Sequence, residues 1–86
     1  MAKPVDFEYR DRLIDMGLTI AALRKLRGFS QDDLATKAGI SRQTLGTIES
    51  PNVVQSFSIE TLLKLADALE VDPADILHTT FPATKK

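Results

Sequence analysis

Residues 29–50 decide the fold, and they read FSQDDLATKAGISRQTLGTIES. The stretch predicts two short helices, over Gln31–Lys37 and Arg42–Glu49, with a turn between them. Gly39 lies just past the first helix, where the backbone must become left-handed and where a side chain would be costly. The two helix axes are therefore expected to cross sharply at this glycine.

Both helices carry the same two start signals. Ser30 and Ser41 each stand where a hydroxyl can accept a hydrogen bond from the amides of the first helical turn. An apolar residue before each serine can pack on one inside the helix, the hydrophobic staple, as Phe29 with Leu34 and Ile40 with Leu45. These local signals define where each helix begins.

An earlier helix is predicted from apolar residues that recur at steps of three and four, namely Leu13, Met16, Ile20, Leu23 and Leu26. The pattern favours a helix from Asp6 to about Arg27. Gly17 can interrupt it, since glycine inside a helix costs about 1 kcal/mol relative to alanine. A short N-terminal segment followed by a first helix from Met16 is the alternative.

Two further helices are expected after Pro51, which ends the preceding helix because the residue before a proline is pushed out of the helical region. After a loop over residues 51–57, Ser58 begins a helix that ends near Glu70, and Asp72-Pro73 opens a fifth. The staple recurs twice, as Phe57 with Leu62 and Val71 with Ile76. The predicted buried face of the fourth helix comprises Ile59, Leu62, Leu63, Ala66 and Leu69.

Length and composition indicate one helical domain. With 86 residues, the chain can bury about 60% of the surface that it exposes when unfolded. We expect a domain over residues 16–78, a helical N-terminal extension over residues 1–15 and a flexible tail over residues 79–86. The absence of cysteine excludes disulfides and thiol catalysis. With neither an apolar leader nor a run of about 18 apolar residues, we expect a cytoplasmic protein without membrane contact.

Enzymatic activity is not expected. The single histidine, His78, lies near the chain end, and no convergent pair of carboxylates is evident. Asp32, Asp33 and Glu60 are typical of first-turn acids that favour the helix dipole, and they do not predict a metal site. We therefore expect no cofactor and no metal.

Charge is unevenly distributed along the chain. The net charge is -1 overall, which does not by itself indicate a nucleic-acid binder. Between Arg24 and Glu49, however, five basic residues stand against three acidic ones, a net +2. From Ser58 to Leu77, one basic residue stands against five acidic ones, a net -4. One end of the molecule can therefore approach phosphates while the other repels them.

The chain resembles the phage-repressor and Cro type of helix-turn-helix domain, the XRE family. The resemblance covers about Met16 to Leu77 and rests on the segments SQDDLA, AGIS, LGTIE and LLKLADALEV. It implies an all-α, five-helix, lambda-repressor-like fold, here with an extra N-terminal helical segment. It also implies double-stranded DNA as the partner.

Helix geometry and the resemblance agree on the residues that contact bases. Because Leu45 and Ile48 face inward, the opposite face of their helix carries Gln43, Gly46, Thr47 and Ser50, with Arg42 at its start. Arginine can pair with guanine and glutamine with adenine through two hydrogen bonds each. In the family, the base-contacting positions correspond to Arg42, Gln43 and Thr47.

A second set of residues is expected at the DNA backbone. Gln31 begins its helix, whose exposed amides suit a phosphate, and the resemblance assigns it a backbone contact. Thr44 and Asn52 occupy family positions that also contact the DNA backbone. Lys37 is a weaker candidate for such a contact. The family also pairs the residue at Glu49 with an arginine, here Arg24, in a structural salt bridge.

Two functions remain open from the sequence. The first is a sequence-specific transcriptional regulator, a repressor, that inserts residues 42–49 into the major groove as a homodimer with half-sites about 34 Å apart. The second is a protein-interaction module of the same fold, such as the antitoxin of a toxin pair. The candidate dimer contacts are Phe7, Tyr9, Phe81, Val53 and Val54.

Overall fold

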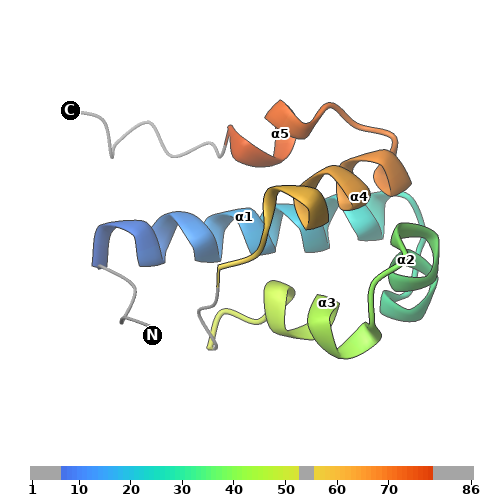
Figure 1. Ribbon diagram of the computed structural model, residues 1–86, viewed down its shortest axis with the longest axis horizontal. Coiled ribbons are helices and arrows are strands. Elements are labelled where there is room, and N and C mark those ends of the chain that lie inside the picture. The colour runs from blue at the N-terminus through green and yellow to red at the C-terminus, as the bar shows by residue number, and fades with distance from the viewer. Residues whose placement is uncertain (1–6, 53–55, 79–86) are drawn as a thin grey trace.

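Five helices form the molecule in the computed structural model, which describes residues 7–52 and 56–78 (Figure 1). They are α1 Phe7–Leu26, α2 Gln31–Ala38, α3 Arg42–Glu49, α4 Ile59–Leu69 and α5 Pro73–Leu77. No strand occurs within the described ranges. The predicted all-α, five-helix fold is confirmed.

Helix α1 runs through Gly17 without a break, so the alternative of a helix that begins at Met16 is wrong. Gly17 has a packing role instead. A Cβ added there would overlap the carbonyl oxygen of Ile48 in α3 and lie 3.2 Å from its carbonyl carbon. The missing side chain therefore lets the backbones of α1 and α3 come into direct contact.

The start of each later helix follows the predicted signals. Each cap side chain accepts a hydrogen bond from an amide of the first turn, and the caps are Ser30, Ser41, Ser58 and Asp72. At α2 the cap is reciprocal, because the Asp33 carboxylate accepts from the Ser30 backbone amide at 3.0 Å. The hydrogen bond from the Ser30 backbone amide, together with the nearby Ser30 side chain, holds the pKa of the Asp33 carboxyl group below its usual value.

Three helices are followed, within two residues, by a residue with positive φ. Gly28 and Gly39 have φ of 78° and 74°, as glycine allows, and the prediction at Gly39 is confirmed. At the end of α4 the residue is Glu70, with φ of 60°. Arg27 supports this strained end, because its guanidinium donates to the carbonyls of Leu69 at 2.8 Å and Glu70 at 3.2 Å.

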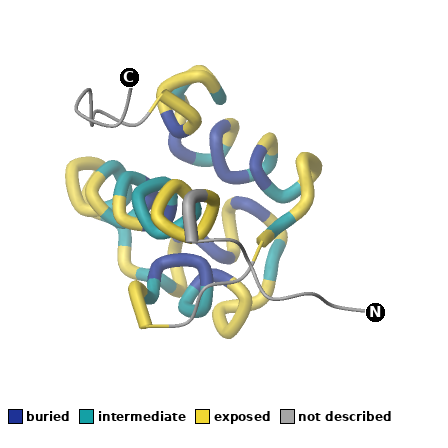
Figure 2. Tube along the Cα trace, turned by 90° about the vertical axis from the view of Figure 1, so that its left-hand side faces the viewer, coloured by how far each residue is buried: buried dark blue, intermediate teal, exposed yellow. Residues whose placement is uncertain are grey.

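The core lies where all five helices meet, and the buried segments face one another across it (Figure 2). It comprises Ile20, Leu34, Ala35, Ala38, Leu45, Ile48, Leu62, Leu65, Ala66, Leu69 and Ile76. The residue before each N-cap packs against this cluster, as the staples require, and these are Phe29, Ile40, Phe57 and Val71. Short-range signals thus also fix how each helix enters the core.

Two residues predicted for the buried face of α4 are exposed, so the prediction is wrong there. Ile59 is 69% exposed and Leu63 is 45% exposed. Residues turn by about 100° along a helix, and the buried arc of α4 is formed by Leu62, Leu65, Ala66 and Leu69. Leu65, left out of the predicted face, lies inside this arc, while Ile59 and Leu63 lie on its flank.

Several expectations fall outside what the structure describes. These are the flexible tail over residues 79–86 and the dimer contacts through Val53, Val54, Phe81 and the side chain of Phe7. Within the described ranges, no helix combines the length and apolar character needed to cross a membrane. The same ranges hold no cluster of three or more histidine or acidic side chains suited to a metal ion.

The contact at Gly17 makes a testable prediction. Gly17→Ala should lower the free energy of unfolding by about 1–3 kcal/mol or more, because a Cβ cannot enter without separating α1 from α3. Gly46 in α3 is the matched control, since a Cβ there meets nothing within 4 Å. Gly46→Ala should raise stability by up to about 1 kcal/mol through helix propensity. Urea unfolding of both variants measures the difference, and equal effects would contradict this role for Gly17.

Candidate nucleic-acid interface

Helix α3 has one face in the core and one at the surface. Leu45 is fully buried and Ile48 is 8% exposed, so the helix is anchored along this side. Arg42, Gln43 and Thr44 are exposed at its start, and Thr47 is half-buried one turn later. The structure therefore brings the three predicted base-contacting residues to one end and one side of α3.

A hollow of about 220 Å³ adjoins this surface. Its lining joins α3 to the chain just before α4 and comprises Gln43, Thr44, Thr47, Ile48, Ser56 and Phe57. Ile48 and Phe57 supply apolar surface, and the other four supply amide and hydroxyl groups. A hollow of this mixed character suits a group with both an apolar and a polar edge, such as a sugar-phosphate unit. Sequence reasoning missed Ser56, which no motif distinguishes from an ordinary loop serine.

Arg42 is held by an ion pair at the surface. Its Nε lies 3.1 Å from Oδ1 of Asp32, at the start of α2, and the two side chains are 65% and 74% exposed. Exposed pairs of this kind contribute at most about 1 kcal/mol. The guanidinium can therefore exchange Asp32 for another acceptor at little cost.

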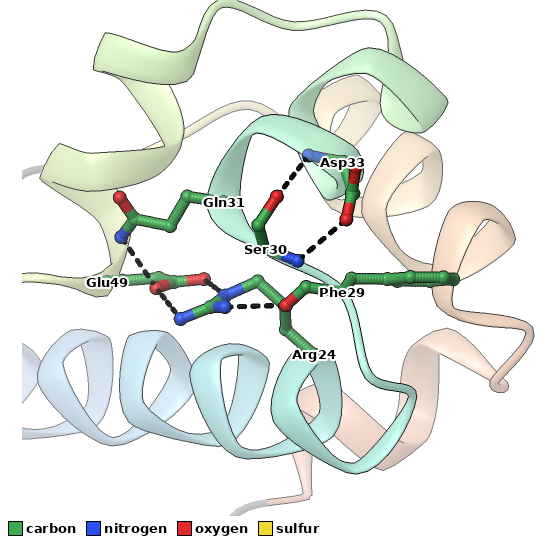
Figure 3. A network of polar contacts seen from close by, with 6 residues as sticks. All are labelled: Arg24, Phe29, Ser30, Gln31, Asp33 and Glu49. Atoms are coloured by element: carbon green, nitrogen blue, oxygen red, sulfur yellow. Dashed lines mark hydrogen bonds and ion pairs between the residues drawn. The ribbon is translucent and has the colours of Figure 1, made fainter.

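A buried ion pair fixes the other end of α3 (Figure 3). Arg24 donates to both carboxylate oxygens of Glu49, from Nε to Oε2 at 2.8 Å and from Nη2 to Oε1 at 3.1 Å. Its remaining nitrogen, Nη1, donates to the carbonyl of Phe29 at 2.8 Å. The Arg24 and Glu49 side chains are only 11% and 5% exposed. The pairing expected from the family resemblance thus joins α1, α3 and the segment before α2.

Gln31 belongs to the same network, which sequence reasoning did not foresee. Its Nε2 donates to Oε1 of Glu49 at 2.9 Å, so the side chain turns toward α3 (Figure 3). A carboxamide nitrogen carries two hydrogens. Glu49 therefore orients Gln31 and leaves its second N–H available.

The other phosphate candidates are spread around α3. The Thr44 hydroxyl accepts from the Ser41 hydroxyl at 2.7 Å, so its own hydrogen is free to be donated. Asn52 is exposed after α3, with its backbone amide 3.3 Å from the Ser50 hydroxyl. Lys37 is exposed, and its Nζ lies 5.4 Å from the centre of the Phe29 ring, within the range of a cation–π contact.

Comparison with known proteins identifies the family. A helix-turn-helix family model matches residues 20–76, the part of the chain that contains this site. The chain belongs to the helix-turn-helix family. The resemblance to the phage-repressor and Cro type drawn from the sequence is thereby confirmed. No curated protein sequence matches the chain.

Solved structures of regulators have the same fold. The restriction-modification controller protein C.AhdI from Aeromonas hydrophila is 32% identical to this chain, with a TM-score of 0.72. The match covers 77% of this chain and 97% of that one. The biofilm regulator SinR, solved in complex with DNA, is 35% identical, with a TM-score of 0.67 over 72% and 97%. A SinR/SinI complex is 31% identical, with a TM-score of 0.71 over 83% and 68%.

The buried pair should be essential for stability. Glu49→Ala should lower the free energy of unfolding by about 3–5 kcal/mol, because the Arg24 guanidinium is then buried without a partner. Glu60→Ala is the control, since Glu60 pairs with Lys64 at 3.6 Å on the surface and should contribute less than about 1 kcal/mol. Denaturant unfolding compares the two, and a similar loss for both would disprove the special role of Glu49.

Proposed function

We propose that this protein binds double-stranded DNA in a sequence-specific way by inserting α3 into the major groove. The observation that supports this most is the free face of α3, where Arg42 and Gln43 are exposed while Leu45 and Ile48 anchor the helix from behind. A helix fixed along one side can present its other side to the base edges without rearrangement.

Three side chains would read the bases. Arg42, released from Asp32, can donate two hydrogen bonds to O6 and N7 of guanine. Gln43 can donate to and accept from adenine, and Thr47 can contact a thymine methyl group. Gly46 lies between them on the same face, and the open space around it allows the bases to approach the helix.

A second group would hold the DNA backbone and set the register. The amino end of α2 offers unpaired amides, and the remaining N–H of Gln31 lies beside them. The Thr44 hydroxyl, Asn52 and Lys37 complete the proposed phosphate contacts. Such contacts position the protein and carry no sequence information.

We infer that the protein acts as a homodimeric transcriptional repressor, with residues 16–78 as the binding domain and residues 7–15 as an extension of α1. Two observations support this inference. SinR was solved with DNA, and it shares the fold at 35% identity. The molecule measures 35 × 31 × 21 Å, so equivalent points in two touching copies can lie one turn of DNA, about 34 Å, apart.

A protein-interaction module, such as an antitoxin, is the second candidate. Two observations favour it: SinR also occurs in a complex with SinI, and residues 58–77 of this chain carry a net charge of -4. An acidic surface of this kind suits a basic protein partner. The two functions are compatible, since they use different faces.

Selection from random duplex DNA tests the base contacts. Gln43→Ala should relax the selected sequence at one or two positions and weaken the best site by about 1–3 kcal/mol. Gln31→Ala should weaken all sequences alike. Thr47→Ala should change the profile, whereas its matched control Thr36→Ala, on the exposed side of α2, should leave it unchanged. Identical profiles for the wild type and Gln43→Ala would refute base reading.

The response to salt separates the two candidates. A DNA regulator should lose affinity for its selected duplex steeply between about 50 and 200 mM salt, because each phosphate contact releases counterions. Lys37→Ala should make this dependence shallower by about one contact. Fluorescence anisotropy with a labelled duplex measures both effects. An absence of any duplex binding at the low-salt end would leave only the interaction module.

A further inference from the structure

Two acidic residues stand side by side in the first turn of α2, and the helix cap uses only one of them. The Asp33 carboxylate accepts from the Ser30 backbone amide at 3.0 Å and completes the cap. The Asp32 side chain is 74% exposed, and its Oδ1 lies 3.1 Å from Nε of Arg42. A carboxylate is thus held beside the first residue of the proposed reading helix.

The start of α2 lies along α3, which sets where Asp32 can reach. Gln31 donates to Glu49 at the end of α3 at 2.9 Å. The next residue of α2 pairs with Arg42 at the start of the same helix. Consecutive residues of α2 therefore contact both ends of α3, and the Asp32 carboxylate remains close to the Arg42 guanidinium when that group turns toward a base.

Asp32 needs a hydrogen-bond donor once Arg42 contacts DNA. The exposed ion pair contributes at most about 1 kcal/mol, so guanine can replace Asp32 as the acceptor for Arg42. The freed carboxylate can only accept hydrogen bonds, and the phosphates around it repel it. The donors that DNA offers in the major groove are the exocyclic amino groups of cytosine and adenine.

The groove edge of a G·C pair matches the two side chains best. Adenine carries the acceptor N7 next to its amino group, whereas cytosine presents its N4 amino group alone. A G·C pair therefore offers two acceptors, N7 and O6 of guanine, followed by one donor, N4 of cytosine. O6 and N4 are about 2.9–3.0 Å apart, because a hydrogen bond joins them. Nε of Arg42 and Oδ1 of Asp32 lie 3.1 Å apart, so the protein carries the complementary groups at a similar spacing.

We propose that Asp32 is a specificity-determining residue that reads the cytosine of the same G·C pair whose guanine Arg42 contacts. Arg42 donates to O6 and N7 of guanine, and the Asp32 carboxylate accepts a hydrogen bond from N4 of cytosine. This inference rests on the proposed function, since it needs α3 in the major groove. Asp32 also excludes A·T at this position, because the acceptor O4 of thymine would face the carboxylate.

A base analogue that lacks only the amino group tests the contact. The duplex is the one that the wild type selects, and the G·C pair is the one whose selection Arg42→Ala loses. In the test duplex 2-pyrimidinone replaces the cytosine, so guanine keeps O6 and N7 while the N4 amino group is removed. Fluorescence anisotropy should show the wild type binding the test duplex more weakly by about fivefold or more. Asp32→Ala should bind both duplexes alike.

The ratio of the two affinities isolates the amino group from other effects of the substitution. Asp32→Ala frees Arg42 and removes a negative charge, which changes both affinities in the same way. Asp67→Ala, at an exposed acid of α4, removes the same charge elsewhere and should keep the wild-type ratio. A wild type that binds both duplexes equally, or an Asp32→Ala variant that keeps the wild-type ratio, would overturn the proposal.

Replacement of the whole pair by A·T tests the exclusion. Asp32→Ala should bind the A·T duplex more tightly than the wild type does, because no carboxylate then faces O4 of thymine. Its preference for G·C over A·T should therefore be smaller than that of the wild type, while Asp67→Ala should keep the full preference. The same preference in the wild type and in Asp32→Ala would contradict the exclusion.

These measurements also separate the role of Asp32 from the proposed function. If the wild type selects a sequence and Gln43→Ala changes it, the DNA function stands, and an unchanged ratio in Asp32→Ala then removes only the role of Asp32. If the wild type selects no duplex, the proposed function fails and the role of Asp32 fails with it.

Discussion

The carboxylate of Glu49 is the point at which three helices of this protein meet. It ends α3, accepts two hydrogen bonds from Arg24 of α1 and a third from Gln31 at the start of α2. Arg24 in turn holds the backbone just before α2 through the carbonyl of Phe29. With almost no exposure to water, these groups satisfy one another, and a shift of any one helix would leave a buried charge without a partner. The angle between α2 and α3 is constrained in this way.

The neighbouring residue reinforces the same end of α3. The carbonyl of Ile48 lies directly against Gly17 of α1, a contact that only glycine permits. Two consecutive residues therefore fix the end of α3, one through backbone packing and one through hydrogen bonds. The start of α3 is held differently, by the Ser41 cap and by a weak surface pair to Asp32. The helix is thus rigid where it joins the core and adaptable at its start, where Arg42 is exposed.

Patterns among neighbouring residues predicted the local features correctly, whereas the one distant contact that was predicted, Arg24 with Glu49, came from the family resemblance. The caps at Ser30, Ser41 and Ser58, the start of α5 at Asp72-Pro73 and the left-handed Gly39 were predicted correctly, because each depends on residues close in sequence. The hydrogen bond from Gln31 to Glu49 spans 18 residues, and that from Arg27 to Leu69 spans 42. Such contacts depend on how helices are placed in space, which local patterns do not encode. The exposure of Ile59 shows the same limit. The apolar periodicity of α4 predicted a buried face that included Ile59. How much of that face is covered, however, depends on where the neighbouring helices lie.

The distribution of charge implies how such a protein would bind DNA. In residues 24–49, Arg24 and Glu49 cancel each other inside the fold, which leaves four basic residues against two acidic ones. Arg27 is also committed, because it closes the end of α4. With so few free cations and a net charge of -1, long-range attraction is weak, so affinity has to come from directed contacts made by correctly placed groups. Asp32 strengthens this requirement, since its carboxylate repels phosphates, and it does so more strongly once Arg42 leaves it for another acceptor. Precise placement of α3 by the Glu49 network is therefore the main means by which the proposed interface would discriminate one DNA sequence from another.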